Sequence, residues 1–570
     1  MRNNGAENLR SARERRISPT FEKKTPTFSE KSPTFFGKSP TFFEKSPTFF
    51  LKRPTFFLKA PIFKGKITQT ARFTLRRKGE KSRGQVAKQW LAALRSPFAL
   101  GAILKHYLQT TYMKSLSLTT LCLLATLSAG AQTLAPFDKS HVAAFGLNNP
   151  ADTSLRYAPE VANAYTAFEQ PLFATLADMV PYRIPAIAVT PKGTLIAVSD
   201  YRPCGGDIGF GRVDLRYRLS NDNGHTWSPQ YVLAQGDGVT GSRKCGYGDA
   251  AIVADRKSNE VVVVCVTGNT VYGHGTTTRQ NPNRVAVLHS TDGGRTWSHP
   301  AEITEAIYGL FDQSQLGPVA SLFFGSGRIC QSGRIKVGRY YRLYAALCAR
   351  PGGNRVVYSD DFGRTWHALG SIHTSPAPKG DEPKVEELPN GDVVLSSRAY
   401  GGRFFNVFHY MSHKNATGTW ENDAVHSAEV AGGVKALQNS TNGEILIVPA
   451  VERATGKKLP LALQSVPLGP GRANVGVYYK ALSSESDYNT AKGFAQNWSG
   501  PFQVSTNLSA YSTMVQQQDG RIAFFYEEET YGKGLSYTNM YRPLTLEQIT
   551  GGKFSPVSTK KANKKRVPNR

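Results

Sequence analysis

From about residue 180 onward, short apolar or β-branched runs alternate with turn-forming residues. Examples are IPAIAV (184–189), TLIAV (194–198), AIVAD (251–255), VVVVCV (261–266), DVVLSS (392–397) and IAFFYE (522–527). Gly, Asn, Asp and Pro separate the runs, and no segment shows the convincing 3.6-residue period of an amphipathic helix. The pattern predicts an all-β protein built from many short antiparallel strands.

One eight-residue element with the pattern S-x-D-x-G-x-T-W occurs three times, starting at Ser220, Ser290 and Ser359. In a tight β-hairpin turn, Asp accepts backbone N–H groups, Gly adopts a positive φ angle and Trp packs the turn onto the sheet. We therefore assign these aspartates to the fold and not to catalysis. Degraded copies stand at residues 418–420 and 497–498. Repeated antiparallel units spaced by about 70 residues predict a β-propeller.

The positive charge of the chain is concentrated at its two ends. The 570 residues carry a formal net charge of +28, of which residues 1–112 contribute +18 and residues 560–570 contribute +6. The region between them is nearly neutral and has no basic stripe with interleaved stacking aromatics. This distribution argues against a nucleic-acid-binding protein.

The first 112 residues contain a basic seven-residue repeat, as in SPTFFEK from Ser39 and SPTFFLK from Ser46. A proline in every seventh position forbids a continuous helix, and the period is too short for a solenoid. We expect residues 1–112 to be a low-complexity extension without a stable fold, or sequence that lies upstream of the true start of translation.

Residues 113–131 have the features of a secretory signal peptide. Lys114 provides a positive charge after Met113, residues 116–127 are apolar, and residues 129–131 form a small-x-small cleavage site. The mature chain would then begin at residue 132. We expect it to be exported to the periplasm, the cell surface or the medium.

Residues 132–550 are expected to form one domain, followed by a basic tail at 551–570. At about 70 residues for each unit, this length accommodates six blades, so the predicted fold is an all-β, six-bladed β-propeller. No apolar run of about 18 residues occurs in the mature part, so no transmembrane segment is expected. The five cysteines of the expected mature part leave two alternatives open, a bridge between Cys204 and Cys245 or free thiols.

With the segment Tyr182-Arg183-Ile184-Pro185 added to the repeated turns, the sequence resembles the exo-α-sialidases of the bacterial neuraminidase type. The turns match their Asp box, or BNR repeat, and the segment matches their Arg-Ile-Pro motif. The resemblance covers residues 180 to 545, roughly. It implies a sialidase propeller that releases terminal α-linked sialic acids from glycoproteins, glycolipids or oligosaccharides. It also implies no metal or organic cofactor, and we expect a monomer.

The chemistry of sialic acid explains which side chains such a site needs. The substrate carries a carboxylate on its anomeric carbon, and the forked guanidinium of arginine fits a carboxylate best. A carboxylate nucleophile would be repelled by this group, whereas a neutral tyrosine deprotonated by a glutamate would not. A separate acid must protonate the leaving oxygen.

Three segments are predicted to be strand–turn–strand hairpins, with turns at residues 191–193, 389–391 and 519–520. In a hairpin with about seven residues in each strand, residue i+16 returns beside residue i. Arg398 should therefore lie near Glu382, and Glu527 near Tyr511. The first residues of these strands should meet at one end of the propeller.

The resemblance assigns the catalytic roles. Tyr511 is the nucleophile, Glu382 is the base that activates it, and Asp207 is the general acid/base. Alternatives are a plain turn role for Asp207 and a role for Glu386 or Glu387 in place of Glu382.

The resemblance also assigns substrate-binding residues. The carboxylate clamp consists of Arg183, Arg398 and Arg472, although Arg472 is also compatible with an ordinary surface position. Glu527 orients Arg183 by an ion pair, and the expected contacts to ring substituents are Arg202 and Asp249. Two rival functions stay open: a catalytically silent sialic-acid-binding propeller, and a trans-sialidase of the same fold.

Overall fold

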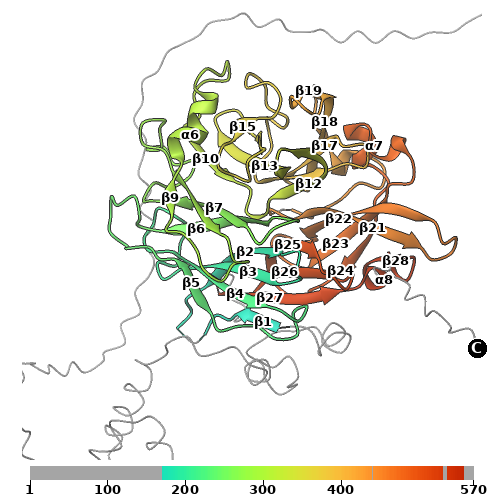
Figure 1. The fold of residues 1–570 in the computed structure, drawn as a ribbon, viewed down its shortest axis with the longest axis horizontal. Helices are drawn as coiled ribbons and strands as arrows, with labels where there is room; N and C mark the ends of the chain where they lie inside the picture. The colour runs from blue at the N-terminus through green and yellow to red at the C-terminus, as the bar shows by residue number, and fades with distance from the viewer. Residues whose placement is uncertain (1–169, 177, 439–440, 530–535, 558–570) are drawn as a thin grey trace, which may run out of the picture. The chain divides into compact units, whose positions relative to one another are not determined.

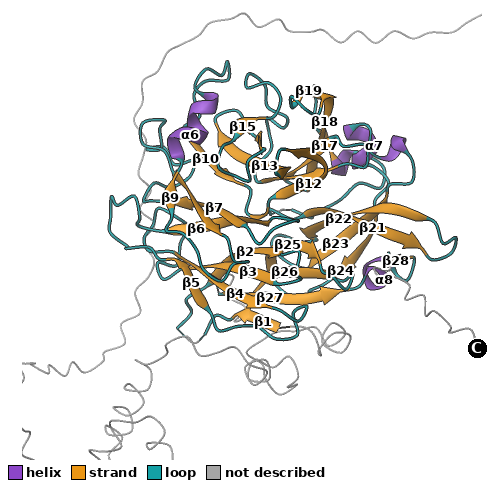
Figure 2. Ribbon diagram, viewed as in Figure 1, coloured by secondary structure: helices purple, strands orange, loops and turns teal. Residues whose placement is uncertain are grey.

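The computed structural model describes residues 170–557, apart from residues 177, 439–440 and 530–535. The chain divides into two units, Met1–Ser115 and Leu116–Arg570, and every described residue belongs to the second. The expected N-terminal extension, the signal peptide and residues 558–570 lie outside the described residues. Strands dominate the described part (Figure 2), where no helix is long and apolar enough to cross a membrane.

Six mainly antiparallel sheets follow one another along the described chain and form the blades of a propeller (Figure 1). Blade 1 contains β2 (Tyr182–Val189), β3 (Leu195–Tyr201), β4 (Asp214–Ser220) and β5 (Tyr231–Ala234). Blade 2 contains β6 (Tyr247–Ala254), β7 (Val261–Thr267), β8 (Arg284–Ser290), β9 (Ala301–Glu302) and β11 (Gly327–Arg328), which pairs parallel to β6. Blade 3 contains β10 (Ser321–Phe324), β12 (Cys330–Val337), β13 (Tyr340–Arg350), β14 (Arg355–Ser359) and β15 (His367–Ala368).

The remaining three blades complete the ring. Blade 4 contains β16 (Pro383–Glu387), β17 (Val393–Ala399), β18 (Gly402–Ser412), β19 (Thr417–Trp420) and β20 (Val425–His426). Blade 5 contains β21 (Ile445–Glu452), β22 (Lys458–Pro467), β23 (Val475–Ala481), β24 (Ser499–Gln503) and β28 (Phe554–Pro556). Blade 6 contains β25 (Ser509–Gln516), β26 (Ile522–Glu529), β27 (Tyr537–Leu544) and β1 (Gln170–Phe173).

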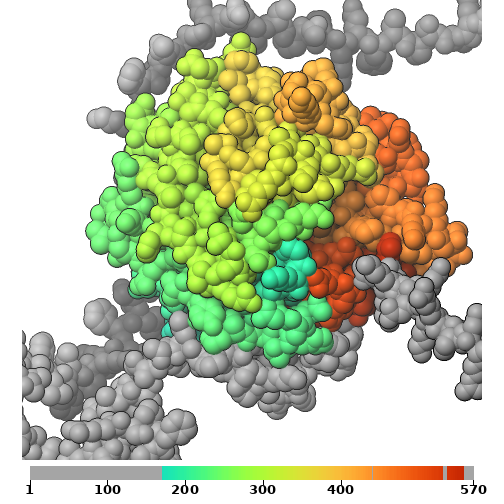
Figure 3. Space-filling view, viewed as in Figure 1, coloured from blue at the N-terminus to red at the C-terminus, as the bar shows by residue number. Residues whose placement is uncertain are grey.

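The first and last parts of the described chain close the ring. β1 pairs with β27 as the outer strand of blade 6, while β2 packs against β25 at the inner side. In the space-filling view, the cyan start of the described chain lies directly beside the red last blade (Figure 3). Pairing of β1 covers a sheet edge that would otherwise expose unpaired backbone groups. Residues just before blade 1 thus help to close the propeller.

The core lies between neighbouring blades, and β7 shows why. Alternate side chains of a strand point to opposite faces. Val261 and Val263 join a cluster shared with blade 1, whereas Val262 and Val264 join one shared with blade 3. Both faces of the strand are buried, so its sequence is a continuous apolar run and not an alternating one.

The three Asp boxes form the turns from β4 to β5 in blade 1, from β8 to β9 in blade 2 and from β14 to β15 in blade 3. In the first, Asp222 accepts hydrogen bonds from Thr226 N (2.9 Å) and Thr226 Oγ1 (2.6 Å), and the same bonds recur in the other two. Gly224 has a φ angle of 82°, and a Cβ atom there would lie 2.0 Å from Tyr541 Oη of blade 6. The turns therefore serve the fold, as expected.

Short helices that the sequence did not predict connect some strands. They are α6 (Thr304–Tyr308), α7 (Ala491–Ala495) and α8 (Leu546–Thr550), together with the 3₁₀ turns η1 (Gly309–Phe311), η2 (Ser427–Glu429) and η3 (Glu485–Asp487). Five residues are too few to show a helical period in the sequence. Caps fix them instead: the Thr490 side chain accepts from Gly493 N in α7, and Thr545 forms a capping box with Gln548 in α8.

Candidate active site

The predicted site residues meet at one end of the propeller. This mouth is formed by the beginnings of β2 and β25, the residue before β16, and the loops after β3 and β22. A pocket of about 180 Å³ lies there. Its polar lining consists of Arg183, Asp207, Asp249, Glu382, Arg472 and Tyr511. The other three predicted residues, Arg202, Arg398 and Glu527, contact members of this set.

Tyr511 and Glu382 form the centre of the mouth. Tyr511 Oη donates a hydrogen bond of 2.7 Å to Glu382 Oε1, and Arg398 Nη1 donates one of 3.0 Å to Glu382 Oε2. The backbone N–H of Arg398 also donates to the carbonyl of Glu382, as the hairpin spacing predicted. Burial and the neighbouring Glu382 carboxylate raise the pKa of Tyr511 well above its ordinary value. The phenol is therefore neutral in the free protein and is aligned to pass its proton to Glu382.

Glu527 links the first and last blades behind the pocket. Its carboxylate accepts two hydrogen bonds from Arg183, at 2.8 and 3.3 Å, and one from Ile184 N at 2.6 Å. It also accepts from Tyr511 N at 3.3 Å, which is the second contact predicted from hairpin spacing. Because the carboxylate is fully buried, the position of Arg183 is fixed before any ligand binds.

The inner strands of three blades bulge at the mouth. The pairing register shifts between Arg183 and Ala186 in β2, after Gly248 in β6 and after Ser509 in β25. At two of these bulges a non-glycine residue has a positive φ angle, 52° at Ile184 and 53° at Asp249. Such backbone strain is uncommon, above all for a β-branched residue. Bulges redirect side chains at strand ends, and here they lie where the pocket residues are presented.

Arginines lie close to the ring of Tyr511. The guanidinium carbons of Arg472 and Arg183 lie 5.5 and 5.7 Å from the ring centre. Arg183 is paired with Glu527 and Arg398 with Glu382, but Arg472 makes no ion pair within the part of the chain that the structure describes. This side of the pocket therefore has a positive charge to offer to an anion.

A second charged cluster lies on the other side of the mouth, around Arg202. This buried guanidinium contacts Asp207, lies 2.8 Å from Asp200 Oδ2, and is 3.5 Å from Asp249 Oδ1. Asp207 lies at the exposed rim of the pocket. The surrounding protein displaces part of the water near its carboxyl and so raises its pKa, but the attraction of Arg202 outweighs this and the pKa falls below the ordinary value. Burial and the nearby Asp200 raise the pKa of Asp249 well above its ordinary value. Asp200 was not among the predicted site residues.

An apolar wall of the pocket was also missed by sequence reasoning. It comes from three blades and consists of Ile208, Val266, Val271, Tyr272 and Phe323 together with Ile184. The rings of Tyr272 and Phe323 meet edge to face with centres 4.7 Å apart. The described cysteines are all free, so no bridge joins Cys204 to Cys245.

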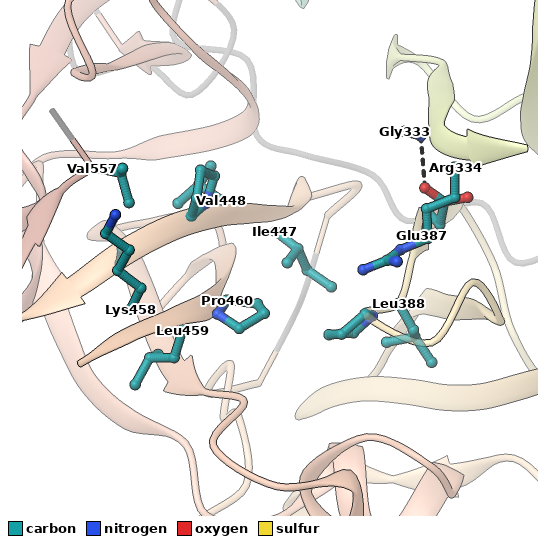
Figure 4. Close-up of a pocket in the computed structure, with 13 residues that line it drawn as sticks. Gly333, Arg334, Glu387, Leu388, Ile447, Val448, Lys458, Leu459, Pro460 and Val557 are labelled. Carbon is teal, nitrogen blue, oxygen red and sulfur yellow. Dashed lines mark hydrogen bonds between the residues drawn. The ribbon is translucent and has the colours of Figure 1, made fainter. Parts of the chain in front are cut away.

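The two carboxylates that competed with Glu382 lie away from the mouth. Glu387 lines a separate groove of about 680 Å³ between blades 4 and 5, where it accepts from Gly333 N at 2.6 Å (Figure 4). Glu386 pairs with Arg328 and accepts from Cys330 Sγ at 3.2 Å. Both therefore face neighbouring strands, and of the three only Glu382 lines the mouth pocket.

Comparison with known proteins agrees with this architecture. The BNR repeat-like domain matches residues 193–524, more than half of the chain. A sialidase of Micromonospora viridifaciens is 30% identical over 379 residues, which are 63% of this chain and 51% of that protein. A sialidase of Paraclostridium sordellii is 27% identical over 265 residues, 45% of this chain and 62% of that protein. The chain thus spans between half and two thirds of the length of these relatives.

Solved structures show the same fold. The Hadza microbial sialidase Hz136 superposes with a TM-score of 0.51 at 22% identity, covering 67% of this chain and 69% of that one. An intramolecular trans-sialidase from Ruminococcus gnavus superposes with a TM-score of 0.50 at 16% identity, covering 66% and 98%. The domain match over residues 193–524 and the related sialidase sequences show that the chain belongs to the bacterial sialidase family with BNR repeats.

Proposed function

We propose that the protein is a retaining exo-α-sialidase, which hydrolyses terminal α-linked sialic acids from glycoconjugates. The observation that carries this proposal is the 2.7 Å hydrogen bond from Tyr511 Oη to Glu382 Oε1, with the guanidinium groups of Arg183 and Arg472 within 6 Å of the ring centre. Such a pair supplies a nucleophile that is uncharged until it reacts. It suits a substrate whose own carboxylate would repel an anionic nucleophile.

Binding is expected to begin with the substrate carboxylate. Arg472 makes no ion pair with any described residue, while Arg183 and Arg398 are already held by Glu527 and Glu382. Bidentate contacts from fixed guanidinium groups orient a carboxylate without ordering the side chains at the moment of binding. The anomeric carbon, which bears this carboxylate, is thereby brought to Tyr511.

The reaction then proceeds in two displacements. Tyr511 Oη attacks the anomeric carbon as its proton passes to Glu382, and the bond to the leaving oxygen breaks as that oxygen takes a proton from Asp207. In the second displacement, Asp207 removes a proton from water, whose oxygen attacks the same carbon. The bond to Tyr511 breaks, and the phenol regains its proton from Glu382. Two inversions give net retention.

Asp207 must gain a proton before it can serve as the acid. In the free protein Arg202 keeps the pKa of Asp207 low. A bound substrate adds its own negative charge to the pocket and compensates the positive field of Arg183 and Arg472, which also face Asp207. Both effects raise the pKa of Asp207, because a nearby negative charge disfavours the ionised carboxyl.

The decisive experiment compares the purified full chain with Tyr511→Phe and Asp207→Ala on a fluorogenic α-sialoside. Release of the fluorophore by the wild type, with a large loss in Tyr511→Phe, is expected, and NMR should show the α-anomer of sialic acid first. Saturable binding of sialic acid without release would instead favour the silent binding propeller. Transfer of sialic acid to an added sugar would favour a trans-sialidase.

We also propose export of the protein, on the pattern of residues 113–131.

A further inference from the structure

We propose that Asp200 is a positioning residue. It keeps Arg202 in place by an ion pair, so that Asp207 can move away from Arg202 and protonate the departing oxygen. Asp200 lies at the end of β3, paired in register with Arg183. Its side chain is fully buried and touches none of the atoms that react. The proposal rests on the proposed function, since it concerns how the acid of that reaction is supplied.

The geometry makes Asp200 the principal partner of Arg202. Arg202 donates to Asp200 Oδ2 twice, from Nη2 at 2.8 Å and from Nε at 3.2 Å. The same carboxylate accepts the backbone N–H of Asp249 at 3.1 and 3.2 Å, at the bulge where Asp249 has its positive φ angle. A Cβ atom on Gly248 would lie 2.7 Å from Asp200 Oδ2, so this glycine leaves room for the carboxylate.

Asp207 competes with Asp200 for the same guanidinium under very different conditions. The Asp207 side chain is 71% exposed and contacts Arg202 through Nη1 alone. Asp200 is buried and uses the other two donors. An ion pair with an exposed group is weak, whereas a buried charge depends strongly on its partner. Arg202 therefore stays with Asp200 when Asp207 moves toward a ligand.

Several charged groups act on this pair, and they set the direction of the effect. Asp200 faces Arg202 on its own loop, Asp249 and Arg183 on neighbouring strands, and Cys265 on β7. If Asp200 lost its charge, Arg202 would interact more strongly with its remaining acidic partners, Asp207 and Asp249. The loss would also remove a negative charge from the neighbourhood of Asp207. Both changes lower the pKa of Asp207 and make it a poorer proton donor at neutral pH.

The test is Asp200→Asn in the full chain, assayed with two substrates. The first, 3′-sialyllactose, has a poor leaving group that needs the acid, and 4-nitrophenyl α-sialoside has a good one that needs it little. We expect the kcat/KM for 3′-sialyllactose, divided by that for 4-nitrophenyl α-sialoside, to be about tenfold lower in Asp200→Asn than in the wild type. The basic limb of the pH profile for 3′-sialyllactose should move about one unit lower, since only protonated Asp207 is active.

Two controls separate positioning from simple damage. The ratio is measured on one preparation, so it does not depend on how much of the variant is folded, and Asp200→Glu should restore the limb in part. Asp214→Asn removes another fully buried carboxylate at the end of the same loop, one that binds Arg212 and Arg216 instead. It should leave the ratio unchanged.

The outcomes distinguish the two proposals. If the wild type hydrolyses neither substrate, the proposed sialidase activity is wrong and the role of Asp200 falls with it. If the wild type is active but Asp200→Asn slows both substrates equally, with an unmoved basic limb, the role of Asp200 alone is overturned. A lowered ratio together with a shifted limb supports it.

Discussion

Charged residues lie directly before strand β16 and within it, and the two groups behave differently. At the mouth, Glu382 belongs to a pocket in which the charges are separated. On one side, Arg472 has no acidic partner among the described residues, whereas on the other a single Arg202 faces three aspartates. Such an arrangement fits a ligand that is anionic at one end and needs a proton at the other.

Further along the same strand, the charges are buried and balanced. Lys384 donates to the carbonyls of Ser326 (2.9 Å) and Arg328 (2.6 Å), and its Nζ lies 3.4 Å from Glu444 Oε2. Glu386 pairs with Arg328. Two cations and two anions thus hold inner strands of blades 2, 4 and 5 together. The separated charges at the mouth are suited to binding a ligand, whereas the balanced, buried charges around Lys384 stabilise the contact between blades.

The largest expected effect comes from the mouth. Tyr511→Phe removes the nucleophilic oxygen and leaves the ring beside the arginines. We expect kcat to fall on the order of 10³-fold or more, with little change in the melting temperature. Tyr308→Phe, which also deletes a buried tyrosine hydroxyl, is the matched control and should keep its activity. Equal activity of Tyr511→Phe and the wild type would remove Tyr511 from the mechanism.

Changes in the buried network around Lys384 should lower the stability of the protein. Lys384→Met leaves Glu444 buried without its lysine, and we expect the free energy of unfolding to fall by about 3–5 kcal/mol. Replacing an exposed lysine nearby, Lys379→Met, should cost far less. The double change Lys384→Met with Glu444→Leu should recover part of the loss, because no unpaired charge remains. Chemical denaturation of all three variants checks this.

Much of this architecture could be predicted because it depends on local spacing. The Asp boxes place the strands that flank them in three blades. The hairpin count of 16 residues brought Arg398 to Glu382 and Glu527 to Tyr511. Such contacts follow from the rise of a strand and a short turn, and need no knowledge of the ring.

The remainder depends on the closed ring and could not be predicted. The bulges place Ile184 and Asp249 at positive φ angles, a conformation that neither residue signals as glycine would. Asp200 has the appearance of an ordinary strand end, and its role emerges only when β6 packs against it. The apolar wall combines Tyr272 and Phe323 from segments that meet only after folding.

Arg472→Lys should sharpen the view of the mouth as an open anion site. The charge is kept, but the fork that grips a carboxylate with two N–H groups is lost. We expect KM for a sialoside to rise on the order of tenfold with a smaller change in kcat. Arg243→Lys is the control, since that side chain is 69% exposed and does not line the pocket. An unchanged KM in Arg472→Lys would return Arg472 to a surface role.

The smallest expected effect is that of salt, which should change KM at the mouth but not the stability contributed by the network around Lys384. The mouth pocket is reached from solvent, so screening weakens its attraction for an anionic substrate, and KM should rise roughly threefold between low salt and about 0.5 M NaCl. The network around Lys384 is shielded by the blades, and buried pairs are screened much less. The loss of stability in Lys384→Met should therefore be nearly the same at both salt concentrations. If KM does not change with salt while the loss of stability in Lys384→Met does, the assignment of the two regions is reversed.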